Sequence, residues 1–416
     1  MLSRRQVLKG VGGGALVLGS AAAGGGLAVP KLSWAADKPS LPKGLPPGVY
    51  DEAVLEALPD KASLIKLSYR PPNYETPIRY FNSTFTPNEA FFVRYHLSTI
   101  PEVDASTWRL SVGGDAAERP FQLTLDQLKS DFTPVEIAAV CQCSGNRRGL
   151  SQPHVPGVQW GYGAMGNAKW KGARLKDVLE RAGIKKEAVE VVMDGEDGPP
   201  VDKTPDFVKS IPAWKALDEN ALIAYEMNGM PLPHFNGFPA RVVIPGWTAT
   251  YWMKHVTSIN AVAKPFDGFW VKSAYRIPTG KFPVVQRFAS QETEANTPIT
   301  EMVVNSLITS IADGQKVPLG KPLDVRGVAW DGGYGIRTVD VSLNGGKTWQ
   351  SATLGEDSGR FSFRPWRFLF TPSRGGTYTV MATATNKIGQ SQTAELIFNP
   401  AGYHNNVMHR VTVQAA

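Results

Sequence analysis

The chain has 416 residues, of which 42% are hydrophobic and 19% charged; this is an ordinary globular composition, and the length predicts two domains. Its formal net charge of +7 falls to +3 once the first 36 residues, which hold four basic residues and no acidic one, are set aside. Because no basic run or basic helix remains, no nucleic-acid partner is expected.

Residues 1–36 have the features of a twin-arginine signal peptide. Arg4 and Arg5 are adjacent, residues 11–29 form a weakly hydrophobic Gly-rich run, and residues 33–36 supply small residues suited to cleavage. We therefore expect a protein that is exported folded to the periplasm. It should have no membrane span once the signal is removed.

A short strand is predicted over residues 91–96, where positions 91, 93 and 95 alternate with positions 92, 94 and 96. This period places Arg94 and His96 on one face of the strand. From the pattern alone, such a basic pair is as readily a solvated face as a binding site.

The only two cysteines follow the apolar run 135–140, which predicts a buried strand. A disulfide between Cys141 and Cys143 would be badly strained at this spacing. Arginine and backbone N–H groups lower the pKa of a neighbouring thiol, and the thiolate is the form that binds metals. The segment therefore favours a reactive or metal-bound thiol at a strand end.

Two short helices are predicted, over residues 123–130 and 175–182. In the second, apolar residues recur at i, i+3, i+4 and i+7, and Gly183 occupies the usual position of a helix-ending glycine. Strands are expected at 189–193 and 222–227, the latter ending in an Asn-Gly hairpin turn.

Cations also occur in apolar surroundings further along the chain. Arg241 is the charged residue of the apolar run 238–246, and Lys254 follows within Trp-Met-Lys-His. A buried arginine needs an anionic partner, so an anion is expected beside Arg241.

From about residue 301 the chain changes to short alternating strands with Gly and Asn turns, as at 323–330, 339–343 and 378–384. This pattern predicts an all-β, immunoglobulin-like sandwich without the usual cysteine pair. Residues 286–300 read as a linker.

Cys-Ser-Gly-Asn-Arg-Arg at 143–148 resembles the cysteine loop of the sulfite oxidase family, and residues 91–96 resemble its Phe-Phe-Val-Arg-x-His segment. The resemblance extends over residues 75–412. It implies an α+β fold: a mixed, sulfite-oxidase-type molybdopterin-binding catalytic domain at 75–285, then an immunoglobulin-like dimerisation domain at 301–416. The Pro-, Lys- and Leu-rich residues 37–74 predict an extended N-terminal arm.

The resemblance also implies a mononuclear molybdenum–molybdopterin cofactor, with the Cys143 thiolate as the metal's protein ligand. The residues that it implies for holding the cofactor are Arg94, His96, Asp197, Asn236, Arg241 and Lys254. Animal relatives have His in place of Asn236, while this chain has His234 two residues earlier, so either residue is open as the cofactor contact. The implied catalytic residues are Arg94, His96, Arg148, Tyr275 and, reaching back from the sandwich, Arg367.

The function implied by the resemblance is oxidation of sulfite to sulfate. The sequence has no Cys-x-x-Cys-His haem attachment site, so we expect the electrons to pass to a separate c-type cytochrome. A homodimer through the C-terminal domain is expected. Two alternatives remain: a sulfane dehydrogenase component of a thiosulfate-oxidising system, and a non-catalytic secreted binding protein whose working part is the sandwich.

Overall fold

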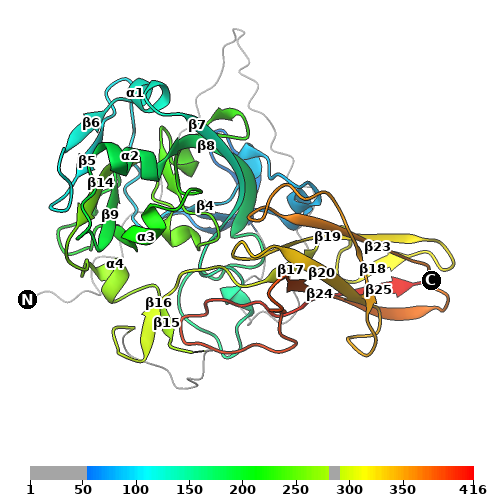
Figure 1. Ribbon diagram of the computed structural model, residues 1–416. Coiled ribbons are helices and arrows are strands. Elements are labelled where there is room, and N and C mark those ends of the chain that lie inside the picture. The colour runs from blue at the N-terminus through cyan, green and yellow to red at the C-terminus, as the bar shows by residue number, and fades with distance from the viewer. Residues whose placement is uncertain (1–53, 281–290) are drawn as a thin grey trace, which may run out of the picture. The chain divides into compact units, whose positions relative to one another are not determined.

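The computed structural model describes residues 54–280 and 291–416 (Figure 1). The predicted signal peptide and the first part of the predicted arm lie outside the described residues. Within them, a first half built from mixed strands and short helices is followed by an all-β second half. This confirms the predicted fold class. No helix in the described part of the chain has the length and apolarity needed to span a membrane.

Residues 54–75 form strands rather than an extended arm. β1 (Val54–Ala57), β2 (Ser63–Ser68) and β3 (Asn73–Glu75) pair antiparallel with one another, and β3 pairs with β4 (Val93–Arg94). Buried Leu64 and Tyr74 form a small core with Val93 and Tyr95. The described part of the predicted arm is thus a meander that supports β4, and the expected boundary at 74/75 cuts through β3.

The first half contains three further sheets. One is five-stranded, with the order β10 (Lys209–Pro212), β9 (Glu190–Gly195), β14 (Val256–Val262), β5 (Leu110–Gly113), β6 (Phe121–Leu123). Another runs β12 (Met230–Pro231), β11 (Leu222–Met227), β8 (Met165–Arg174), β7 (Pro134–Gln142), with β13 (Arg241–Val243) also on β11. The third pairs β15 (Arg276–Pro278) with β16 (Asn296–Pro298), so part of the predicted linker is a strand.

Short helices connect these strands. They are α1 (Leu125–Ser130), α2 (Leu175–Arg181), α3 (Ala213–Ala216), α4 (Phe269–Lys272) and the 3₁₀ turns η1 (Ile78–Asn82), η2 (Asn88–Ala90), η3 (Arg148–Leu150), η4 (His234–Asn236) and η5 (Ala249–Tyr251). Gly183 follows α2 with φ +68°, which confirms the predicted glycine at the helix end. Asn228 and Gly229 both have positive φ, as a two-residue hairpin turn requires.

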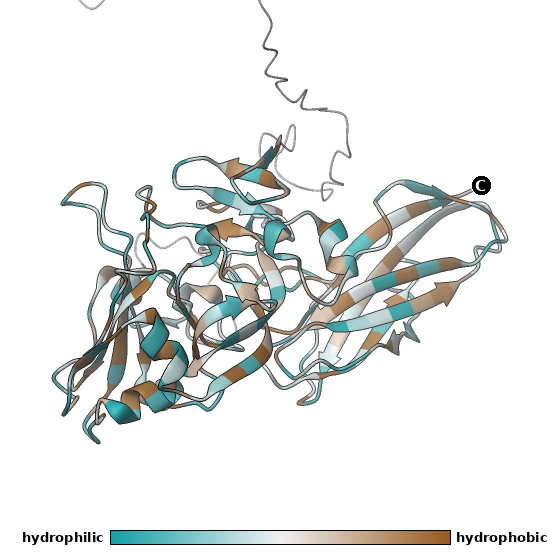
Figure 2. Cartoon of the chain, turned by 90° about the horizontal axis from the view of Figure 1, so that it is seen from above, coloured by the Kyte–Doolittle hydropathy of each residue, from teal (hydrophilic) through white to brown (hydrophobic). Residues whose placement is uncertain are grey.

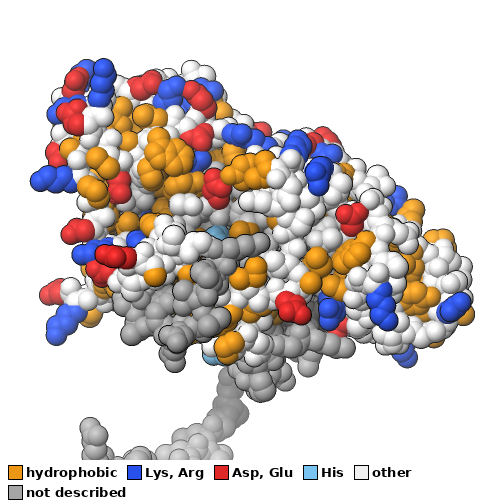
Figure 3. Space-filling view, turned by 60° about the horizontal axis from the view of Figure 1, so that its bottom comes forward, with side chains coloured by type: hydrophobic (Ala, Val, Ile, Leu, Met, Phe, Trp, Pro, Cys, Tyr) orange, Lys and Arg blue, Asp and Glu red, His pale blue; other side chains and the backbone are white. Residues whose placement is uncertain are grey.

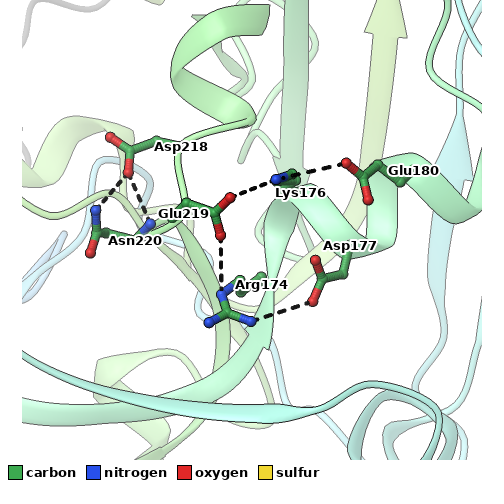
Figure 4. A network of polar contacts seen from close by, with 7 residues as sticks. All are labelled: Arg174, Lys176, Asp177, Glu180, Asp218, Glu219 and Asn220. Carbon is green, nitrogen blue, oxygen red and sulfur yellow. Dashed lines mark hydrogen bonds and ion pairs between the residues drawn. The ribbon is translucent and has the colours of Figure 1, made fainter.

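Charged side chains surround α2 on the surface (Figure 4). Glu219 lies between Lys176, at 2.5 Å, and Arg174, at 3.6 Å, and so ties the start of the helix to the loop before β11. Because the Glu219 side chain is 64% exposed, these ion pairs are screened by water and contribute little to stability.

The second half is a sandwich of two sheets. One has the order β17 (Asn305–Ile308), β19 (Leu323–Trp330), β23 (Arg364–Phe370), β22 (Thr353–Leu354). The other runs β18 (Gln315–Val317), β25 (His409–Ala415), β24 (Gly376–Asn386), β20 (Ile336–Ser342), β21 (Gln350–Ser351). Figure 2 shows brown and teal alternating along several of these strands, and β25 alternates buried with more exposed residues.

The two halves share a hydrophobic cluster. Val140 of β7 and Met165 of β8 pack in it with Trp330 of β19 and with Phe363. The indole N–H of Trp330 also donates to Gln142 Oε1 at 2.6 Å. The end of the cysteine-bearing strand is therefore held by the second half as well as by the first.

Candidate active site

The two cysteines occupy different environments at the end of β7. Cys141 is inside the strand and 1% exposed, whereas Cys143 follows the strand and is 8% exposed. Burial raises the pKa of the Cys141 thiol to about 11, although Arg241 Nη2 lies 3.9 Å from its sulfur. Both are free thiols. Because Cys141 is enclosed and stays protonated at neutral pH, Cys143 is the better thiolate ligand.

The Ser-Gly-Asn segment after Cys143 fastens this loop. Cys143 N–H donates to the carbonyl of Ala164 at 2.9 Å, and Asn146 Oδ1 accepts the N–H of Ala164 at 3.1 Å. Gly145 leaves room for an arginine, because a Cβ there would lie 2.5 Å from Arg148 Nη1. Gly145 and Asn146 thus each have a structural reason.

Arg147 fastens the same loop to the sandwich. Its side chain is fully buried and donates to the carbonyls of Val407 (2.8 Å) and Ser306 (2.9 Å), while its own carbonyl accepts from Asn405 Nδ2 at 3.1 Å. Its φ of 67° is unusual for a residue other than glycine. Arg147 therefore supports the loop and leaves Arg148 as the arginine that can face a ligand.

A pocket opens beside the cysteines. It is lined by residues from the β4 region, the end of β7, the turns η4 and η5 and the segment before β15. Those used below are Arg94, His96, Cys141, Cys143, Ser144, Asp197, Phe207, Asn236, Arg241, Thr250, Lys254 and Tyr275.

Positive charge dominates this pocket. Arg94, Arg241 and Lys254 face the single carboxylate of Asp197 among its lining residues. Burial lowers the pKa of Lys254 well below its usual value, and the Asp197 carboxylate opposes this shift. An anionic ligand would restore the favourable environment that buried cations need.

Buried donors that lack partners also indicate an anionic ligand. Arg241 donates to the carbonyls of Asn236 and Trp252, each at 3.0 Å, yet its Nε has no hydrogen-bond partner among the described residues. Ser144 Oγ and Thr250 Oγ1 are likewise buried and unpaired within that part of the chain. Such groups are costly unless a ligand bonds to them. The pocket therefore fits an oxygen-rich anionic group, which would supply the anion predicted beside Arg241.

His96 and Tyr275 lie together at the pocket wall. His96 Nε2 hydrogen-bonds the Tyr275 hydroxyl, and its ring stacks on Phe207 with centroids 3.6 Å apart. Burial, and then the cations of Arg94 and Lys254, lower the pKa of His96 well below its usual value. His96 is therefore a neutral hydrogen-bonding group.

The Arg94 guanidinium faces the same place. It hydrogen-bonds the Tyr275 side chain and donates from Nη1 to Asn73 Oδ1 at 3.2 Å, so the meander of residues 54–75 helps to aim it. Burial raises the pKa of Tyr275, and the nearby charges of Arg94 and Arg148 oppose that rise. The structure thus brings Arg94, His96, Arg148 and Tyr275 together beside Cys143.

The predicted strand around Arg94 is shorter than expected. β4 contains only Val93 and Arg94, and Phe91 and Phe92 are both buried, so the side chains do not alternate between two faces. The phenylalanines stack on each other (centroids 5.5 Å apart) because both fit the core around Trp170 and Trp160. Arg94 and His96 nevertheless both line the pocket.

The structure distinguishes Asn236 from His234. Asn236 is buried and lines the pocket; its Oδ1 accepts from Lys61 and its Nδ2 donates to the carbonyl of Phe92 at 3.1 Å. The His234 ring instead lies 5.5 Å from the ring of His255 and is not among the lining residues. Asn236 is therefore the residue of this pair placed to contact a cofactor.

Lys61 was not predicted from the sequence. It follows a Leu-Pro-Asp turn that looks solvent-exposed, yet its ammonium is buried and donates to the carbonyl of Asn88 at 2.7 Å as well as to Asn236. Only the fold, which closes the β1–β2 turn over η2, reveals this.

Lys209 was also missed, although a lone cation with Phe-Val before it and Ile-Pro shortly after it was a usable signal. Its Nζ lies 4.7 Å from the Tyr251 ring centroid and 5.2 Å from that of Tyr275.

A Lys61→Met variant tests the support of Asn236. We expect it to lower retained molybdenum about 10-fold, a typical loss when a supporting partner of a metal or cofactor ligand is removed. The measurement is the molybdenum-to-protein ratio after gel filtration. Lys66→Met, which removes only a partly exposed ion pair with Glu56 on the same sheet, is the control and should retain metal. Equal ratios in the two variants would contradict the role.

Arg367 does not reach the pocket, and this part of the prediction is wrong. Along β23 the side chains alternate, so Trp366 is buried in the sandwich while Arg367 is 57% exposed and pairs with Asp324 at 2.7 Å. Because Arg367 lies on the outer face of this strand, its guanidinium meets a carboxylate of the neighbouring strand β19 rather than the ligand.

Accordingly, Arg367→Ala is expected to leave KM and kcat within about twofold of the unmodified protein, since an exposed ion pair has little effect on a distant site. Steady-state kinetics with the metal-loaded protein checks this. A tenfold rise in KM would show that Arg367 does act on the substrate.

Comparison with known proteins agrees with this geometry. Residues 96–270 match the oxidoreductase molybdopterin binding domain, and residues 296–416 match the Mo-co oxidoreductase dimerisation domain. The chain is 31% identical to sulfite oxidase of Arabidopsis thaliana, covering 88% of this chain and 98% of that one. It is 34% identical to mitochondrial sulfite oxidase of Rattus norvegicus, covering 83% of this chain but 65% of the rat protein.

Among solved structures, the sulfane dehydrogenase SoxCD from Paracoccus pantotrophus is similar, with a TM-score of 0.71 and 25% identity over 90% of this chain and 91% of that one. Fold and pocket together define a molybdopterin-dependent oxidoreductase. The chain belongs to the sulfite oxidase family, and its cofactor is molybdenum bound to molybdopterin.

The donor set fits that cofactor. Cys143 would supply the thiolate to the metal. Arg241 and Lys254 are placed to hold the anionic part of the pterin, with bidentate hydrogen bonds available from arginine and a point charge from lysine. Asp197 and Asn236 can accept from and donate to the polar edge of the pterin.

Proposed function

We propose that this protein is a sulfite dehydrogenase, which oxidises sulfite to sulfate and passes the two electrons to a c-type cytochrome. The observation that carries the proposal is the grouping of Arg94, His96 and Tyr275 with Cys143 in a positively charged pocket. Arg148, which is not among the lining residues, lies near Tyr275. The reaction adds one oxygen atom from water to sulfite and releases two protons and two electrons. Bound molybdenum supplies the oxygen-atom transfer and two-electron chemistry.

The protein's own groups bind and orient the oxyanion. The Arg94 and Arg148 guanidinium groups neutralise its charge and offer planar pairs of N–H donors to its oxygens. The neutral imidazole of His96 and the Tyr275 hydroxyl share a hydrogen bond and can hold or pass a proton beside the reacting oxygen. Because Cys143 and Tyr275 are buried, charges placed beside them act more strongly than they would in water.

A second candidate is favoured by the similarity to SoxCD: oxidation of a sulfane sulfur in a thiosulfate-oxidising system. Both reactions bring a negatively charged sulfur compound to a cationic pocket. They differ in the size of the substrate. The similarity to relatives named sulfite oxidase favours sulfite.

The test is to purify the protein after maturation, measure molybdenum and pterin, and follow cytochrome c reduction with sulfite and thiosulfate separately. Reduction by sulfite alone supports the main proposal, and reduction by a sulfane donor alone supports the second. A protein without molybdenum or pterin would favour the non-catalytic binding protein.

We also propose that the chain works in the periplasm after export through the twin-arginine route, supported by Arg4-Arg5 and the Gly-rich run after it. A carrier of cofactor must be exported folded, which this route permits. Replacing both arginines with lysine should leave the protein in the cytoplasmic fraction. Periplasmic activity from that variant would contradict this route.

A further inference from the structure

A loop of the C-terminal domain enters the first half of the molecule. The loop consists of residues 399–405, which precede β25. The Asn399 side chain holds the loop in shape: its Oδ1 accepts the backbone N–H of Tyr403 at 3.0 Å, and its Nδ2 donates to the backbone carbonyl of Tyr403 at 2.6 Å. Ala401 and Tyr403 are buried in the hydrophobic core of the first half. This loop therefore brings a fixed aromatic ring to the region of the active site.

The loop packs against the Arg148 side chain. Arg148 Nε donates to the carbonyl of Ala401 at 3.0 Å, and Nη1 donates to that of Val158 at 3.1 Å. The guanidinium carbon lies 5.2 Å from the centre of the Tyr403 ring. Gly402 makes the close approach possible, since a Cβ there would meet Arg148 Cγ at 2.8 Å. Two of the five N–H donors are thus bonded to backbone carbonyls.

Tyr403 also contacts the other side of the site. Its ring lies parallel to that of Tyr275, with an interplanar angle of 7° and centroids 5.8 Å apart. Tyr275 in turn hydrogen-bonds His96. One ring from the C-terminal domain therefore packs against two groups that the proposed reaction uses, a cation and a phenol, in contacts typical of cation–π and offset stacking.

We propose that Tyr403 is a positioning residue for oxyanion recognition, holding Arg148 and Tyr275 at a fixed separation. This rests on the proposed function, in which Arg148 binds the substrate. Tyr403 acts through its aromatic face, so a phenylalanine should replace it and an aliphatic residue should not.

The test compares full-length, molybdenum-loaded Tyr403→Leu and Tyr403→Phe. Two quantities are measured per molybdenum: KM and kcat for sulfite, and the Kd of sulfate, the product, by titration calorimetry without turnover. We expect Tyr403→Leu to raise both KM and the sulfate Kd about 10-fold, with kcat changed less than about threefold. Tyr403→Phe should stay within about threefold in all three quantities. Tyr378→Leu, the same substitution at a sandwich tyrosine that packs on Phe370, is the matched control.

An unchanged KM and sulfate Kd in Tyr403→Leu would overturn the proposal, as would a Tyr403→Phe variant as impaired as the leucine variant. If Tyr403→Leu does not retain metal, the unbranched Tyr403→Met variant is judged by the same criterion. Failure of the unmodified protein to oxidise sulfite or bind sulfate would instead overturn the proposed function.

Discussion

Cys143→Ala is expected to give a folded protein whose sulfite oxidation falls by far more than the 10–100-fold that follows loss of a mere supporting partner of a metal ligand. Cys143 is the more accessible thiol, follows the end of β7 and lines the cationic pocket. Removing its sulfur leaves no comparable soft ligand, because Cys141 is enclosed and its pKa is raised to about 11. Activity per protein and molybdenum content are the measurements, with circular dichroism to check folding.

Cys141→Ala is the matched control. It removes the same atoms from the same strand end, and it should retain metal and activity at the cost of a modest loss of core packing. The opposite result, an active Cys143→Ala and an inactive Cys141→Ala, would show that the ligand is the more deeply buried sulfur of Cys141, which also lines the pocket.

The second large effect is expected from Arg94→Met, which should raise the KM for sulfite. Hydrogen bonds to charged groups are each worth about 1.5–3 kcal/mol, so losing this guanidinium should raise the KM for sulfite about 10–100-fold. Molybdenum content should stay close to that of the unmodified protein, because Arg241 and Lys254 remain to hold the cofactor. The readouts are KM, kcat and the metal-to-protein ratio.

Arg109→Met provides the comparison. Arg109 is exposed on the first half and donates to the carbonyls of Ser106 and Trp108, so its loss should leave KM unchanged. If Arg94→Met keeps its KM but loses molybdenum, then Arg94 binds the cofactor rather than the substrate.

Several residues of this site could be predicted from the sequence because they lie in short local motifs. The reactive thiol at the end of a strand followed from the residue types around Cys143, which are unusual for a core. The nearness of Arg94 and His96 to it was implied by the resemblance to the sulfite oxidase family, because the strand pattern alone left a solvated face open. The lone arginine in an apolar run predicted a buried cation, and Arg241 is buried.

What escaped prediction depends on contacts between distant segments. Lys61 and Asn236 are 175 residues apart and meet only after the meander folds over η2. Arg367 was misplaced because the alternation of β23 decides which face a side chain takes, and its pairing partner Asp324 cannot be read from local sequence. Tyr403 showed no pattern at all, since its ring gains a role only from the parallel ring of Tyr275.

The dependence of the cysteine loop on Ser306, Ala401, Asn405 and Val407 has a consequence for biogenesis. Three of the four carbonyls that accept from Arg147 and Arg148, those of Ser306, Ala401 and Val407, belong to parts of the polypeptide made late in translation; the fourth is that of Val158. While the ribosome is still producing these parts, Arg147 lacks both of its carbonyl partners and Arg148 lacks one. We therefore expect metal insertion to await the finished chain, and a truncated product to be a poor acceptor for the cofactor-loading machinery.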